Sequence, residues 1–102
     1  MKLQDNGDTL LISGLKELSA ANANAVRDLV RAALADGQHH IEIDLSQTAQ
    51  VDSCGLGALA ALHKTVSNRQ GSIRLLNPTP SVLQILELTR MHRLFEIVRN
   101  QS

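Results

Sequence analysis

The sequence predicts an α/β domain in which helices pack against a mixed, mostly parallel sheet of about four to five strands. Two observations support this fold class. Short segments rich in β-branched and apolar residues alternate along the chain with longer segments whose apolar residues recur every three to four positions. At 102 residues the chain is long enough for one hydrophobic core but too short for two lobes. We therefore expect a single domain over residues 1–102, with a polar tail at about 99–102.

The first half of the chain contains the first predicted strands and the first predicted helix. Thr9–Ser13 is a β-branched and apolar run between turn residues, and an earlier strand can precede it over 2–5. A helix begins at Ser19, its expected N-cap, and stops at Gly37. Its apolar residues recur at helical spacing and are Ala23, Val26, Val30, Ala33 and Leu34. Residues 40–45 alternate strictly between polar and apolar side chains, which is typical of a strand.

The second half continues the same alternation of strands and helices. The segment 52–57 ends a strand-like run and opens a helix that we expect to end near 68–71. The apolar face of this helix consists of Leu56, Leu59, Ala60, Leu62, His63 and Val66. Ser72–Leu76 is a predicted strand, and residues 80–90 form a predicted helix whose proline lies in the first turn. After a turn, 94–98 is the last predicted strand, and crossover helices between strands predict parallel pairing.

Composition excludes several classes of function. Ten basic and ten acidic side chains give zero net charge without a block of like charges, which argues against nucleic acid and anionic membranes as partners. Phe95 is the single aromatic residue, so base-stacking surfaces are not expected. One cysteine cannot form an internal disulfide, and the sequence has neither a leader nor an apolar run of about 18 residues. We therefore expect a cytoplasmic protein without membrane insertion.

The segment 52–57 is the strongest candidate for a functional site. It lies at the predicted carboxyl edge of the sheet, where sites form in open α/β folds, and the loop around Asn22 can approach it there. The first-turn N–H groups of a helix lack intrahelical acceptors and carry partial positive charge, so an anion is tolerated. Two interpretations of Ser53 remain open: a structural N-cap, or a phosphate acceptor.

Other chemistries have weaker support. The glycines at 55 and 57 lack the spacing and the Lys-Ser/Thr pair of nucleotide-binding loops, and no Gly-x-Ser-x-Gly elbow is present. A lone cysteine such as Cys54 is usually a small buried hydrophobe. The four histidines are scattered, and no third catalytic group accompanies Asp44 and Asp52. We expect a protein that is not an enzyme and that holds neither a metal nor a cofactor.

Four segments together resemble the STAS domain, which anti-sigma factor antagonists share with sulfate transporter tails. They are Ile41-Glu42-Ile43-Asp44-Leu45-Ser46, Val51-Asp52-Ser53-Cys54-Gly55-Leu56-Gly57-Ala58-Leu59, Ile73-Arg74-Leu75 and Pro80-Ser81-Val82-Leu83-Gln84-Ile85-Leu86. The resemblance extends over nearly the whole chain. Because no transporter, kinase or sensor segment accompanies the domain, it is most similar to the bacterial anti-sigma factor antagonists.

The resemblance implies a switched protein–protein interaction. The serine after the motif aspartate is the family's phosphorylation site, which corresponds to Ser53. The partner-binding residues that it implies are Asp52, Ser53, Cys54, Gly55, Leu56, Ser19 and Asn22. The unphosphorylated form would bind an anti-sigma factor with serine kinase activity, phosphorylation would release it, and a metal-dependent serine phosphatase would restore binding. ATP and metal would belong to those partners.

One departure from the family pattern supports an alternative. Family members often carry a Gly-Glu-Leu-Asp turn before the first helix, whereas residues 14–19 form a longer turn with Ser19 in the place of the aspartate. This substitution makes the edge facing a kinase less anionic. The alternative function is an accessory STAS subunit of a lipid-transport ABC complex, which would dock on the ATPase without a phosphorylation switch.

Overall fold

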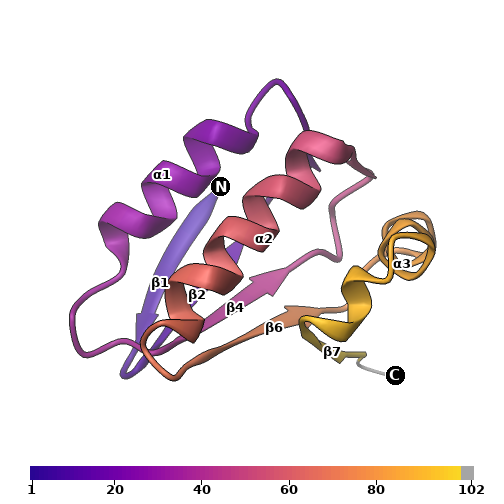
Figure 1. Cartoon of the computed structure of the whole chain (residues 1–102). Coiled ribbons are helices and arrows are strands. Elements are labelled where there is room, and N and C mark those ends of the chain that lie inside the picture. The colour runs from indigo at the N-terminus through magenta and orange to yellow at the C-terminus, as the bar shows by residue number, and fades with distance from the viewer. Residues whose placement is uncertain (100–102) are drawn as a thin grey trace.

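A five-stranded sheet with strand order β1-β2-β4-β6-β7 forms the centre of the molecule (Figure 1). The computed structural model describes residues 1–99. The strands are β1 (Lys2–Asn6), β2 (Thr9–Ser13), β4 (His40–Asp44), β6 (Ser72–Leu76) and β7 (Glu96–Val98). β1 pairs antiparallel with β2, and every other neighbouring pair in this sheet is parallel. The predicted mixed, mostly parallel α/β fold is confirmed.

The helices cover one face of this sheet and leave the other open. α1 (Ala23–Ala33) and α2 (Ser53–Ser67) lie side by side across the strands, and α3 (Pro80–Leu88) packs near one end of the sheet (Figure 1). Strand residues that face the helices are buried and join the helices in one core, among them Ile12, Ile41, Ile43, Ile73 and Leu75. The strict alternation seen in 40–45 reflects this arrangement, because odd positions face the core and even positions face outward.

The first helix differs from its prediction at both ends. α1 begins at Ala23 with Asn22 as its N-cap residue, so the expected N-cap at Ser19 is wrong. The Asn22 side chain accepts from the Ser19 N–H at 2.9 Å, which folds 19–22 into a turn before the helix begins. The helix ends at Ala33, before Gly37, because Leu34 adopts an extended conformation. The buried Gln38 side chain then accepts from the Ala35 N–H at 2.9 Å and holds the chain in a turn.

Two strands of two residues each were not predicted. β3 (Glu17–Leu18) and β5 (Gln50–Val51) form a separate parallel pair, which is too short to show a periodic pattern in the sequence. The last strand begins at Glu96 rather than 94, because a 3₁₀ helix, η1 (Met91–Arg93), occupies the preceding residues. α3 has proline at its first position as predicted. None of the helices within residues 1–99 is long and apolar enough to cross a membrane.

Gly55 allows α2 to approach the backbone of β3 closely. A Cβ atom at position 55 would lie 2.0 Å from the Leu18 carbonyl oxygen, which no side chain can tolerate without movement of the backbone. Two residues later, a Cβ atom at Gly57 would meet nothing within 4 Å. The two glycines of the motif therefore have different roles, and Gly55 sets the position of the start of α2.

Gly55→Ala should destabilise the fold, because the added methyl group forces α2 away from β3, at a cost of about 1–3 kcal/mol. Gly57→Ala is the matched control two residues further along α2, where the glycine is exposed, and it should be neutral or stabilising by up to about 1 kcal/mol. Chemical denaturation of both variants measures the difference. Equal stabilities for the two variants would contradict the close packing of α2 on β3.

Candidate functional site

The candidate site is built around the Asp52 carboxylate, which joins two segments far apart in the sequence. One oxygen, Oδ1, accepts from the Gly55 N–H at 3.0 Å and caps α2. The other, Oδ2, accepts from the Ala20 N–H at 3.0 Å. We call the loop 19–22 together with residues 52–57 the Ser53 edge. The predicted approach of the loop around Asn22 to the segment 52–57 is therefore present.

These two N–H donors also fix the charge of Asp52. Hydrogen bonds from the backbone of Gly55, first, and then Ala20 hold the pKa of this carboxyl below its usual value of 3.8. The carboxylate is therefore ionised at neutral pH and lies directly beside Ser53. Both of its oxygens are engaged in backbone contacts, so Asp52 is a structural anchor of the edge.

Ser53 is the first residue of α2, and it is exposed. Because Asp52 caps the helix, the interpretation of Ser53 as the cap is wrong. Within residues 1–99, its hydroxyl makes no hydrogen bond to another side chain or to the backbone. Cys54 is also exposed, which corrects the expectation of a buried hydrophobe. The outward surface of the helix start is therefore a hydroxyl and a thiol.

The remaining predicted site residues organise the edge from within. Ser19 is only 5% exposed, and its hydroxyl donates to the Glu17 carboxylate at 3.0 Å. Asn22 is half-buried, and its amide donates to the Glu17 carbonyl at 2.8 Å. Gly55 and Leu56 are buried. Most of the residues predicted to contact a partner are therefore covered, and a partner that approaches this edge meets other side chains.

The exposed residues of the loop are Ala20 and Ala21, which sequence reasoning missed. Alanine carries no chemical signature, so nothing in the residue types marks these two positions. Contacts of the loop with Ser19 and Asn22 fold it, and the Asp52 contact to the Ala20 N–H holds it against the start of α2. In the sequence, Asp52 was the one residue that could have indicated this contact. A carboxylate can accept more hydrogen bonds than a helix cap uses, so a second donor was to be expected near it.

Side-chain contacts to the backbone tie the neighbouring loops to one another at this end of the sheet. Thr48 is fully buried, and its hydroxyl donates to the Leu15 carbonyl at 2.6 Å. The Thr79 hydroxyl donates to the Thr48 carbonyl at 3.0 Å, and Ser81 donates to the Ala49 carbonyl at 3.3 Å. The loops after β2, β4 and β6 are therefore linked, which makes the edge a defined surface.

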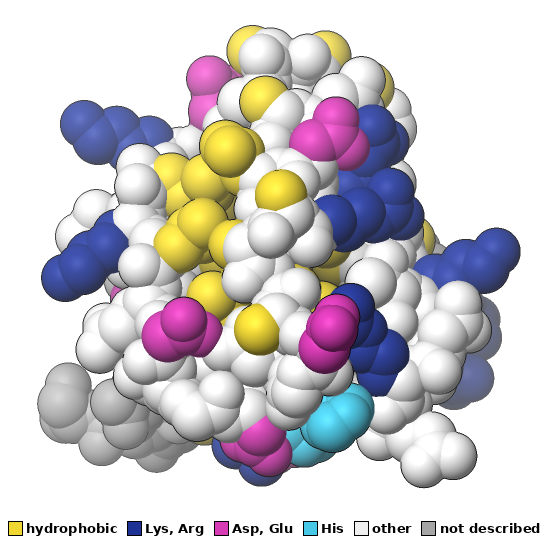
Figure 2. Space-filling model, turned by 90° about the vertical axis from the view of Figure 1, so that its left-hand side faces the viewer, with side chains coloured by type: hydrophobic (Ala, Val, Ile, Leu, Met, Phe, Trp, Pro, Cys, Tyr) yellow, Lys and Arg dark blue, Asp and Glu magenta, His cyan; other side chains and the backbone are white. Residues whose placement is uncertain are grey.

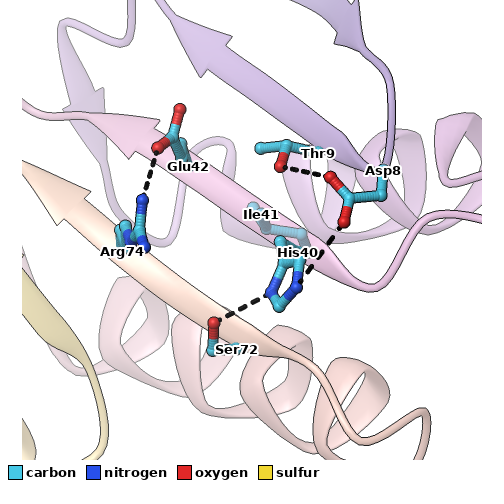
Figure 3. Close-up of a pocket in the computed structure, with 7 residues that line it drawn as sticks. All are labelled: Asp8, Thr9, His40, Ile41, Glu42, Ser72 and Arg74. Atoms are coloured by element: carbon cyan, nitrogen blue, oxygen red, sulfur yellow. Dashed lines mark hydrogen bonds and ion pairs between the residues drawn. The ribbon is translucent and has the colours of Figure 1, made fainter.

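A second polar cluster lies on the open face of the sheet, around a depression of about 230 Å³ (Figure 3). Ser72, His40 and Asp8 follow one another across the strands: the Ser72 hydroxyl lies 3.0 Å from His40 Nδ1, and His40 Nε2 lies 3.8 Å from an Asp8 oxygen. Arg74 lies between Glu42 at 3.5 Å and Glu96 at 3.3 Å. The contacts run between neighbouring strands, as cross-strand pairs do.

This order of serine, histidine and aspartate does not make a nucleophilic site. Such a site needs preorganised donors for an oxyanion and exclusion of water. Here the His40 side chain is 42% exposed, Asp8 lies in the turn between β1 and β2, and the backbone groups of the neighbouring strands pair with one another. Within residues 1–99, no group of three or more His, Cys, Asp or Glu side chains could hold a metal ion. The Ser53 edge therefore remains the stronger candidate for the functional site.

Comparison with known proteins finds similar sequences and similar folds. The model of the STAS domain family matches residues 1–101. A Thermotoga maritima protein, named as a candidate anti-sigma factor antagonist, is 30% identical over 91 residues, which cover 88% of this chain and 80% of that protein. A crystal structure of a Thermotoga maritima protein with the same description has a TM-score of 0.89 at 27% identity, covering 98% of this chain and 86% of the other.

SpoIIAA, named as an anti-sigma factor antagonist, has the same fold. Its unphosphorylated form has a TM-score of 0.84 at 18% identity, covering 99% of this chain and 88% of that one. The phosphorylated form of the Bacillus protein has a TM-score of 0.77 at 17% identity, covering 99% of this chain and 91% of the other. From its sequence match and its fold, the chain belongs to the STAS domain family.

Proposed function

We propose that this protein is an anti-sigma factor antagonist that switches partners through phosphorylation of Ser53. One observation supports this proposal above all: the Ser53 hydroxyl is exposed at the start of α2 and is not needed for capping, because Asp52 caps the helix. The names of the relatives, anti-sigma factor antagonists, support the general function.

The unphosphorylated edge suits a protein partner. Its outward residues are Ala20, Ala21, Ser53 and Cys54, which are small and uncharged, so a partner can cover them with little desolvation cost. The ionised Asp52 is held by two backbone donors and stays paired when water leaves. In this state we expect the edge to bind an anti-sigma factor and thereby free its sigma factor.

A phosphate on Ser53 changes the same surface without a change of fold. It brings nearly two negative charges beside the Asp52 carboxylate, at a point that the partner must desolvate. The positive end of α2 tolerates this charge, so the domain itself stays folded. A hundredfold loss of affinity requires only about 2.7 kcal/mol, which one buried phosphate at an interface can supply.

In the proposed phosphorylation cycle, the catalytic groups belong to the partner proteins and not to this chain. We infer a serine kinase activity in the anti-sigma factor and a separate serine phosphatase that restores the hydroxyl. Asp52 does not serve as the base for phosphoryl transfer, because both of its oxygens accept backbone N–H groups and its pKa is lowered. The kinase must therefore supply the proton acceptor as well as ATP and metal.

Ser53→Asp should weaken binding to the anti-sigma factor by at least about tenfold, whereas Ser53→Ala should bind as tightly as the wild type. Ser67→Asp is the matched control, because Ser67 is an exposed serine at the opposite end of α2. Calorimetric titration measures the three affinities, and mass spectrometry locates the phosphate after incubation with kinase and ATP.

Two outcomes would contradict the proposal. The first is a kinase that is active on another substrate but leaves Ser53 unmodified. The second is unchanged binding of the anti-sigma factor by Ser53→Asp. For the alternative function, an accessory subunit of a lipid-transport ABC complex, both Ser53 variants should leave assembly with the ATPase nearly intact.

Asp52 should make stability depend on pH at the acid end. Since its pKa is lower in the folded state than the ordinary value of 3.8, the carboxylate stabilises the fold above that pH. The contribution is lost as pH falls through the lowered value. Unfolding curves from neutral to strongly acid pH should show Asp52→Asn less stable at neutral pH, with the gap closing in acid. A constant gap would show that the charge of Asp52 does not anchor the edge.

A further inference from the structure

An apolar groove runs beside α1 on the flank of the molecule that Figure 2 shows, where apolar side chains gather between acidic and basic ones. Its volume is about 440 Å³, and its apolar side chains include Met1, Ala25, Val26 and Leu29. Leu29 is 52% exposed and Met1 is 49% exposed, which is high for large apolar side chains. We call this feature the α1 groove.

The α1 groove is continuous with the Ser53 edge. Glu17 and Asn22 line the groove, and the same two residues fold the loop 19–22 through the Asn22 amide contact to the Glu17 carbonyl. On its other side this loop receives Asp52 through the Ala20 N–H. One loop thus separates the groove from Ser53, and a protein that covers the loop reaches both.

The Ser53 edge alone lacks the features that give an interface its affinity. A stable complex uses about 20–30 residues on each side, and a few large side chains seated in pockets supply most of its binding energy. The outward residues of the edge are alanines, a serine and a cysteine, which offer no pocket. The groove supplies one, with an apolar interior and the charged side chains of Lys16 and Glu17 in its lining.

We propose that the α1 groove is the second half of the docking surface for the anti-sigma factor and receives an apolar anchor side chain from it. This inference rests on the function proposed above. The groove supplies affinity and the Ser53 edge supplies the switch. Phosphorylation at one end of the footprint then releases a partner that is held mainly at the other.

Leu29→Asp tests the groove, because it places a charge among the apolar residues at an exposed position of α1. Leu88→Asp is the matched control: Leu88 is 75% exposed and lies on α3, outside the groove. The probe is the purified anti-sigma factor of the same genome that binds the wild-type chain. We expect at least a tenfold loss of affinity for Leu29→Asp and none for Leu88→Asp.

The kinetics of Ser53 phosphorylation give a second measurement. Leu29→Asp should raise the KM of the kinase for this protein and leave kcat unchanged, since the anchor binds equally before and during phosphoryl transfer. If Leu29→Asp does not fold, Ala25→Arg on the same helix replaces it and should have the same effect. Wild-type affinity for the anti-sigma factor in a folded groove variant would overturn the inference. So would a groove variant that no longer binds a second copy of this chain but still binds the anti-sigma factor normally.

The outcomes separate this inference from the proposed function. If Leu29→Asp loses binding while Ser53→Asp binds normally, the groove stands and the phosphorylation switch fails. If Ser53→Asp loses binding while Leu29→Asp binds normally, the switch stands and the groove fails. If no anti-sigma factor of the genome binds the wild-type chain, both fail.

Discussion

The two hydrogen bonds of the Asp52 carboxylate are the interaction on which the candidate site depends. One caps α2, and the other holds the loop 19–22 against the helix start at 3.0 Å. Because a single carboxylate does both, the neighbouring Ser53 has no structural duty and its hydroxyl faces solvent. Two adjacent residues of the edge therefore have different roles. Asp52 holds the loop and the helix start together, and the Ser53 hydroxyl is accessible for modification.

The contacts of Asp52 require close packing of α2 on β3. Asp52 reaches the Ala20 N–H only because α2 lies against β3, and α2 lies there because position 55 has no side chain. The short β3–β5 pair continues this packing, with the Asp52 N–H donating to the Leu18 carbonyl at 3.3 Å. In the proposed switch, a phosphate on Ser53 would act on an approaching partner and not on the fold, because hydrogen bonds already hold the backbone around it.

The sequence was sufficient for the fold class and for most of its strands and helices, and it placed the segment 52–57 at the start of a helix. Alternation in 40–45, helical spacing in α1 and α2, and the proline at the start of α3 each reflect burial on one face, which sequence patterns record directly. The N-cap residues of α1 and α2 were harder to predict. Ser19 and Ser53 are good N-cap residues by type, but Asn22 and Asp52 occupy the N-cap positions. Before α1, contacts of Asn22 with Ser19 and Glu17 fold residues 19–22 into a turn, which delays the start of the helix.

The surface of the site was the least predictable part. Ala20 and Ala21 gain their position from Asp52, which lies 32 residues away from Ala20 in the sequence. Leu29 is 52% exposed, and it was not among the apolar residues of the predicted helix, which are Ala23, Val26, Val30, Ala33 and Leu34. Its part in the groove depends on the loop before α1 and on Met1, which the spacing within the helix does not report.

The central claim is that a phosphate on Ser53 switches partner binding off. The most direct measurement is the affinity of the anti-sigma factor for the chain carrying a genuine phosphoserine at position 53, compared with the unmodified chain in the same titration. We expect the phosphorylated form to remain folded and to bind about a hundredfold more weakly. Equal affinities for the two folded forms would contradict the account.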